Sequence, residues 1–213
     1  MFVRKAHSFK TSYTLRPLFT EGMHLLVFMS VLYAVGFVIG LVIYYSFPTS
    51  LQNGFIVRIH EAIVSLLTGS TVPHVVITES TVELLLLFFL WIFAQTSVGT
   101  PFIVGLLFLR AVSAGLTFLA IMVAFGLRGF GFDLLAIAPS NILTGGSFIL
   151  AATVGLLLIR HSRKGGKSTF GYPVWVAYHG AVLVAAVVLL CSGKLETAAT
   201  MHALGWLALS PGR

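Results

Sequence analysis

Residues Thr100–Phe125, "TPFIVGLLFLRAVSAGLTFLAIMVAF", form an apolar run long enough to cross a lipid bilayer, with one charged residue, Arg110, inside it. A bilayer core about 30 Å thick is crossed by a helix of about 20 residues. Lipid offers the backbone no hydrogen-bond partners, so the run is predicted to be a helix. Inserting an arginine there costs about 2.5–3.5 kcal/mol or more, so Arg110 needs buried acceptors or a route to the headgroups.

Composition indicates that lipid is the main solvent of the whole chain. Of its 213 residues, 58% are hydrophobic and 9% are charged, whereas a soluble globular domain carries about 25% charged residues. The formal charge of +7 does not indicate a nucleic-acid partner, because the basic residues flank apolar runs and form no stripe that alternates with aromatic residues. The single cysteine, Cys191, excludes an intramolecular disulfide.

The apolar runs predict an all-α polytopic membrane protein, a bundle of about five transmembrane helices. The predicted spans are residues 25–47, 82–98, 101–125, 133–159 and 172–190. The first run is too long for a signal-peptide core, so it is predicted to be a retained span. The remaining segments are a basic N-terminal segment (1–24), a loop (48–81) and a C-terminal tail (191–213).

Basic residues predict the orientation of the spans. One cluster precedes the first span and another separates the fourth and fifth: Arg4, Lys5, Lys10 and Arg16, then Arg160, Arg163, Lys164 and Lys167. Cytoplasmic loops carry the excess of basic residues, and the even number of spans between the clusters puts both on one side. The N-terminus is therefore predicted to be cytoplasmic, with loop 48–81 and the C-terminal tail outside.

Loop 48–81 contains an amphipathic pattern. Arg58 and Glu61 fall on one helical face and Ile59 and Ile63 on the opposite face. The pattern predicts a helix that lies in the outer interface of the membrane, packs on the spans, or does both. The following residues, 71–81, alternate and are rich in β-branched side chains, so they are predicted to be extended.

Three intramembrane polar side chains are predicted at one depth. Counted from the cytoplasmic ends of their spans at about 1.5 Å per residue, Arg110, His179 and Tyr33 lie roughly 13, 10 and 12 Å deep. In the predicted cluster Arg110 points into the bundle; the alternative is that it snorkels to the headgroups. Taken alone, His179 is more often a packing residue than a functional one. By the same count Glu83 lies roughly 22 Å deep, so it would have to stretch to meet Arg110.

Small residues recur at four-residue spacing on two spans, as Gly36 and Gly40 on the first and Ala111 and Gly115 on the third. This spacing lets helix backbones approach closely. Packing within the bundle is favoured over an interface with a partner, and whether the chain forms a homo-oligomer is left open.

The fourth span begins at a proline, in the stretch "IAPSNIL". Pro139 lacks an N–H and frees a carbonyl one turn earlier. A broken or re-entrant element is therefore predicted before the fourth span, with Asn141 bonding the freed backbone groups.

No catalytic residue, metal site or cofactor is predicted. His60 and Glu61 begin like a zinc-protease helix, but Val64 stands where the second histidine is needed. The seven histidines form no pair at ligand spacing, and none of the six carboxylates falls securely in the middle of a span. An enzyme is therefore poorly supported, and a cation-coupled transporter only weakly, because such transporters keep Asp, Glu or His along their path.

Three stretches resemble the stage II sporulation protein M family of endospore-forming bacteria: "SVLYAVGFVIGLVI", "TPFIVGLLFLRAVSAGLTFLA" and "GLRGFGFDLLAIAPSNILTGGSFIL". The markers are the proline that opens the third span, a basic residue like Arg110 followed by small residues, and the turn centred on Pro139. The family shares a short basic N-terminus, a first span, an outer loop of this length and four further spans. The chain departs from the family at Ser140, where glutamine or histidine is frequent.

The resemblance implies a non-enzymatic integral membrane scaffold of the sporulation engulfment machinery. Members of the family hold two peptidoglycan-degrading partners, stage II sporulation proteins D and P, at the septal membrane. The implied role is peptidoglycan remodelling at the sporulation septum, while the mother-cell membrane migrates around the forespore. The alternative is a polytopic permease or channel-like component of the wider family.

Overall fold

The computed structural model describes residues 15–67, 72–164 and 172–208, which contain helices and no strands. The all-α prediction is therefore confirmed for the described residues. In chain order the elements are α1 (Leu15–Ser46), α2 (Thr49–Leu67), α3 (Val72–Ala94), α4 (Gly99–Phe132), the π-helical turn η1 (Asp133–Ile137), α5 (Ala138–Lys164) and α6 (Tyr172–Ala208).

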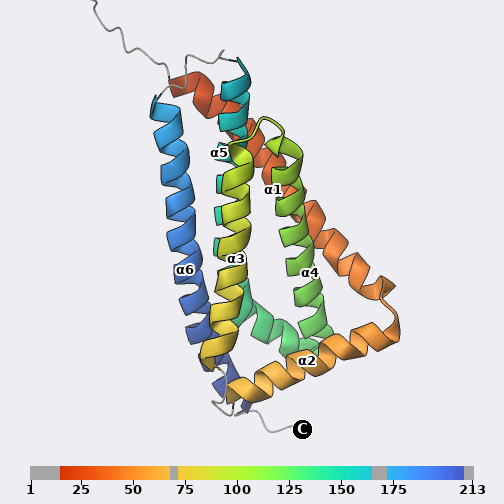
Figure 1. The fold of residues 1–213 in the computed structure, drawn as a ribbon. Coiled ribbons are helices and arrows are strands. Elements are labelled where there is room, and N and C mark those ends of the chain that lie inside the picture. The colour runs from red at the N-terminus through yellow and green to blue at the C-terminus, as the bar shows by residue number, and fades with distance from the viewer. Residues whose placement is uncertain (1–14, 68–71, 165–171, 209–213) are drawn as a thin grey trace, which may run out of the picture.

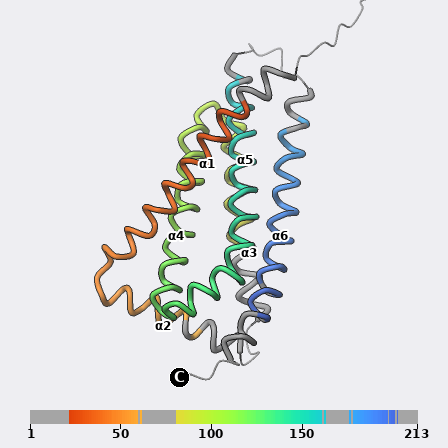
Figure 2. The backbone as a smooth tube through the Cα atoms, turned by 180° about the vertical axis from the view of Figure 1, so that it is seen from behind, coloured from red at the N-terminus to blue at the C-terminus, as the bar shows by residue number. Residues whose placement is uncertain are grey.

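α3, α4, α5 and α6 run roughly along one direction, α1 is inclined to them, and α2 lies across one end of the bundle (Figure 1). The opposite end carries the short turn between α3 and α4, the last turns of α5 and the first turns of α1 and α6 (Figures 1 and 2). We call these two ends the α2 end and the turn end. The chain passes between them along α1, α3, α4, α5 and α6, and successive helices of this series are antiparallel.

Among the described residues, three helical segments are long and apolar enough to cross a membrane: Gly22–Ser46, Gly99–Arg160 and Tyr178–Thr200. The second is 62 residues long and comprises α4, η1 and most of α5. This segment bends at the α2 end, so the chain runs in opposite directions along α4 and α5 (Figure 1). Thr81–Ala94 in α3 is a shorter apolar helix. These segments agree with a membrane protein that has several spans.

The helices bury one shared core and expose apolar outer faces. Buried residues of every long helix meet in the core, among them Met29, Leu90, Ile103, Leu107, Ala151 and Tyr178. Large apolar side chains are exposed on α1 and α6, among them Val31, Val35, Val42, Leu183 and Val187. Helices that are apolar on their outer as well as their inner faces are typical of membrane spans.

The two small-residue motifs lie against each other, where α1 crosses α4. A Cβ atom added to Gly36 would lie 2.9 Å from the Cβ of Ala111. Cβ atoms added to Gly40 and Gly115 would overlap backbone carbonyl groups of the opposite helix. These residues therefore pack within the bundle, and their lack of side chain sets how closely the two backbones approach.

The α2 end of α4 is bent at Gly126, whose φ of 60° and ψ of −140° lie outside the helical region. We expect Gly126→Ala to lower the free energy of unfolding by about 1–3 kcal/mol, because only glycine adopts this conformation without strain. Thermal unfolding in detergent measures the effect.

Gly146→Ala is the matched control for the bend. An added Cβ has no atom within 4 Å at either glycine, and only Gly126 has a positive φ among the described residues. Gly146→Ala should therefore be neutral or stabilising by up to about 1 kcal/mol. Equal effects of the two substitutions would contradict the strain argument.

The predicted extended segment at 71–81 is wrong for residues 72–81, which form the start of α3. β-branched residues disfavour a helix only weakly, and in an apolar medium the helix satisfies its own backbone. Pro73 falls in the first turn, where a missing N–H costs nothing.

Other helix boundaries differ from the predicted spans. α3 ends at Ala94 rather than at residue 98, because residues 95–98 form the turn to α4. α4 continues past residue 125 to Phe132, and α5 begins at Ala138 after η1 rather than at residue 133. α6 continues to Ala208, so residues 191–208 prolong the last helix.

Candidate functional site: a buried polar cluster

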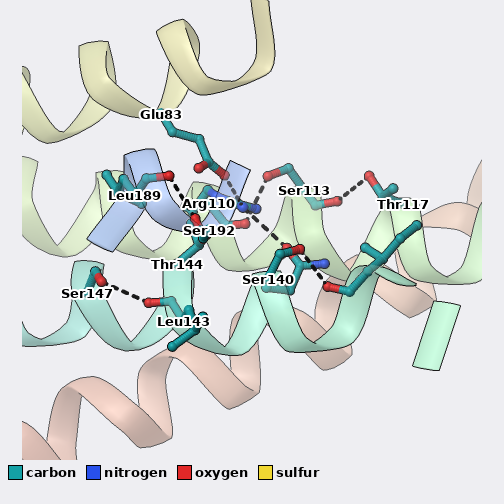
Figure 3. Close-up of polar contacts among 12 residues, drawn as sticks. Glu83, Arg110, Ser113, Thr117, Ser140, Leu143, Thr144, Ser147, Leu189 and Ser192 are labelled. Atoms are coloured by element: carbon teal, nitrogen blue, oxygen red, sulfur yellow. Dashed lines mark hydrogen bonds and ion pairs between the residues drawn. The ribbon is translucent and has the colours of Figure 1, made fainter. Parts of the chain in front are cut away.

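Polar side chains of α3, α4 and α5 meet inside the bundle (Figure 3). The Arg110 guanidinium donates a hydrogen bond from Nη2 to Glu83 Oε1 at 2.6 Å and lies 3.3 Å from Asn141 Oδ1, which also accepts. The Arg110 and Glu83 side chains are 13% and 16% exposed. We call Glu83, Arg110 and Asn141 the Arg110 cluster.

The α3–α4 hairpin brings Glu83 and Arg110 to the same level. Glu83 precedes the end of α3 at Ala94 by about three helical turns, and Arg110 follows the start of α4 at Gly99 by the same distance. The expectation that Glu83 lies too deep to meet Arg110 without stretching is therefore wrong. The depth count treated residues 95–98 as the end of the second span, although they form the turn between α3 and α4.

The ion pair explains how Arg110 is tolerated at this depth. A charge removed from water must be paired and hydrogen-bonded, and a charge-assisted bond to a carboxylate is among the stronger options. Arg110 therefore points into the bundle and does not snorkel to the headgroups. Its Nε is buried and has no hydrogen-bond partner among the described residues, so the guanidinium is only partly satisfied.

Tyr33, a predicted member of the cluster, lies beside it. A Cβ added to Gly145 of α5 would lie 2.9 Å from the Tyr33 hydroxyl. Gly145 lies one helical turn after Asn141 on α5. The Tyr33 hydroxyl therefore packs against α5 one turn from Asn141 of the Arg110 cluster.

His179 is placed in an aromatic group rather than in the Arg110 cluster. Its ring lies edge-on to the rings of Tyr178 and Trp91, with centroids 5.2 and 6.0 Å apart. Trp91 follows Glu83 by about two helical turns toward the turn end. The Tyr178 hydroxyl donates to the Trp91 carbonyl at 3.1 Å, so this group ties α6 to α3.

The break before α5 lies one turn earlier than Pro139. Residues 133–137 form the π-helical turn η1, and the Ala138 N–H donates to the Asp133 carbonyl. Asn141 does not compensate for the proline as predicted; its side-chain oxygen accepts from Arg110 instead. The Ser140 hydroxyl donates to the Ile137 carbonyl at 2.9 Å, which is not the carbonyl four residues before Pro139 that the missing N–H leaves free.

A second polar contact, absent from the sequence prediction, joins α5 to α6. Thr144 Oγ1 and Ser192 Oγ are buried and 3.1 Å apart, and the Ser192 hydroxyl also donates to the Leu189 carbonyl. Asn141 and Thr144 are three residues apart and lie on one face of α5. The three-residue spacing of Asn141 and Thr144 is the sequence pattern that could have predicted a polar face on α5. Asp133 is also buried, and its Oδ1 has no partner among the described residues.

Asn141→Leu is expected to lower the free energy of unfolding by about 1 kcal/mol, because a buried donor on Arg110 loses one acceptor but keeps the carboxylate. The 3.3 Å distance marks this as the weaker of the two Arg110 bonds. Thermal unfolding in detergent measures the change. A loss of stability as large as that of Glu83→Leu would contradict this ranking, because it would mean that the bond to Asn141 contributes as much as the ion pair with Glu83.

The predicted amphipathic helix corresponds to α2. Arg58 and Glu61 are exposed, whereas Ile59 is partly buried against Tyr44 of α1 and apolar residues of α4 and η1. Ile63 lies within α2, and its side chain is outside the described set. α2 therefore packs on the bundle through one face and leaves its charged face free.

No group of three or more His, Cys, Asp or Glu side chains that could hold a metal ion occurs within the described ranges. The chain matches no protein-family model, and no curated protein or solved structure is significantly similar to it.

Proposed function

We propose that the protein is a membrane scaffold of the stage II sporulation protein M type, which holds peptidoglycan-degrading partners at the sporulation septum. One observation carries the proposal beyond the sequence resemblance: the helices follow the order that the family's layout requires. The first long helix leads into the helical segment α2, and four further long helices follow. The π-helical turn η1 lies directly before α5.

The proposed topology has five membrane crossings, along α1, α3, α4, α5 and α6. It is supported by the antiparallel course of these helices, which leads the chain into α1 and out of α5 at the same end (Figure 1). The predicted basic clusters flank these two positions in sequence. With the turn end in the cytoplasm, α2 and the last turns of α6 face the wall side.

The α2 end would then be the surface that meets the hydrolases. α2 exposes a mixed set of side chains there: Phe55, Val57, Arg58 and Glu61. Aromatic residues and arginine, such as Phe55 and Arg58, are enriched in surfaces that bind proteins.

Affinity purification of the tagged protein from sporulating cells tests the proposal. We expect wall hydrolases, the D and P stage II proteins, to copurify in mild detergent. A variant with Arg58→Ala and Val57→Ala, both exposed on α2, should lose them while keeping its unfolding temperature. Recovery of the folded protein without any wall hydrolase would contradict the scaffold role.

A permease is the second candidate, and the Arg110 cluster is the observation that favours it. Ionisable residues inside a membrane mark transport paths in many proteins. The double variant Glu83→Leu/Arg110→Leu removes both charges together. A permease should lose solute flux in reconstituted vesicles with this change, whereas a scaffold should retain its partners.

A further inference from the structure

The turn end carries a small polar pocket that the proposed scaffold role does not use. It has a volume of about 110 Å³ and is lined by Gln95, Thr96 and Ser97 of the α3–α4 turn and by Ile159 and Ser162 of α5. One water molecule occupies about 30 Å³ of liquid, and drug-sized ligands need about 300 Å³ or more. The pocket therefore fits a group of a few heavy atoms.

The sequence segments that form the pocket contain basic residues and no acidic ones. Arg160 is exposed, lies next to Ile159, and makes no ion pair with any described residue. Arg163 and Lys164 follow in the last turn of α5, and residues 91–103 and 155–167 contain no aspartate or glutamate. α4 begins just after the pocket residues with no acidic residue in its first turn and no side-chain cap, which adds a partial positive charge.

The pocket also lies at the depth of lipid headgroups. Arg160 is the last residue of the apolar segment Gly99–Arg160, so the side chains of the pocket stand at the boundary between apolar and polar surface. Leu158 and Ile159 provide apolar lining on the α5 side. Hydroxyl and amide groups therefore sit above apolar side chains at one edge of the bundle.

We propose that this pocket binds a phosphate group, supplied by the headgroup of an anionic phospholipid. The Ser162 hydroxyl and the Gln95 amide can donate to phosphate oxygens, whereas the Thr96 hydroxyl already donates to the Phe93 carbonyl. Arg160, which follows the lining residue Ile159 in the chain, can add a charge-assisted bond. Basic pockets between helices on the cytoplasmic side are suited to anionic headgroups. The inference rests on the proposed orientation for the choice of leaflet and is independent of hydrolase recruitment.

Lipid-induced thermal stabilisation of the full chain in detergent tests the pocket. We expect phosphatidylglycerol at 100 times its Kd to raise Tm by about 5–10 °C, and phosphatidylcholine to have no such effect. Arg160→Gln should remove most of the shift, and Ser162→Leu, which fills the pocket, should reduce it. Arg58→Gln removes an exposed charge at the α2 end and should leave the shift unchanged.

Inorganic phosphate alone distinguishes the two sources of the phosphate group. An equal shift with inorganic phosphate, lost in the Arg160 variant, would keep the phosphate site and assign it to a soluble ligand. Equal shifts with phosphatidylcholine, or a wild-type shift in both pocket variants, would overturn the proposal. Each variant is compared by its own lipid-induced change, so a lower basal Tm does not obscure the result. If wall hydrolases copurify with the Arg160→Gln variant, hydrolase recruitment does not depend on phosphate binding in the pocket.

Discussion

Glu83→Leu is expected to lower the free energy of unfolding by about 3–5 kcal/mol, because it leaves the Arg110 guanidinium buried without its counter-charge. Asn141 at 3.3 Å is the remaining acceptor in the Arg110 cluster, and a neutral amide compensates a full charge poorly. The Arg110→Leu variant should be destabilised in the same way, because it strands the Glu83 carboxylate. Denaturant or thermal unfolding in detergent measures both.

The double variant Glu83→Leu/Arg110→Leu separates the ion pair from general damage to the fold. Replacing both partners of a buried pair with apolar residues is often neutral or stabilising, so the double variant should be more stable than either single one. Glu61→Leu is the matched control, since Glu61 is exposed on α2; it should change stability by no more than about 0.5 kcal/mol. Additive losses in the double variant would contradict the paired arrangement.

Gly115→Ala is expected to destabilise the protein by about 1–3 kcal/mol, because the new methyl group would overlap the α1 backbone and force the helices apart. The obstructing atom is the Phe37 carbonyl oxygen, which cannot move without displacing α1. Gly40→Ala should act similarly against the Val112 carbonyl. Gly36→Ala should cost less, because its added atom lies 2.9 Å from the Ala111 methyl carbon, a smaller overlap than the carbonyl oxygens impose at Gly40 and Gly115.

Gly105→Ala is the control on the same helix. An added Cβ has no atom within 4 Å there, so the substitution should be neutral or stabilising by up to about 1 kcal/mol. Unfolding temperatures of the four variants give the predicted order directly. A Gly105 variant as unstable as the Gly115 variant would show that helix approach is not the cause.

The apolar runs were sufficient to predict the helical class, and the small-residue spacing to predict that Gly36, Gly40, Ala111 and Gly115 pack within the bundle; that α1 packs on α4 through them is a finding of the structure. Apolar runs leave the chain no alternative to helices in lipid, and glycine spacing marks the faces that approach. The sequence pattern was not sufficient for residues 72–81, because the local β preference of Val75, Val76 and Ile77 is weaker than the continuation of α3.

The Arg110 cluster shows why a depth count has limits. The residue that pairs with Arg110 depends on where α3 ends, and hydropathy does not distinguish the last helical turn from the four residues of the hairpin. An error of one turn moves a side chain by about 5 Å, enough to exchange Glu83 for His179 as the expected neighbour. The bend at Gly126 directly follows the predicted end of the third span at residue 125, in a stretch (126–132) that contains Arg128 and three glycines, but hydropathy does not show that the helix resumes after it.

Cysteine accessibility tests the five-crossing arrangement most directly. In a Cys191→Ser background, Gly54→Cys on α2 and Gln95→Cys in the α3–α4 turn place thiols on exposed positions at opposite ends of the bundle. With a membrane-impermeant maleimide, we predict labelling of the Gly54→Cys variant in intact cells, and of the Gln95→Cys variant only after permeabilisation. Labelling of position 95 in intact cells, or protection of position 54, would contradict the account.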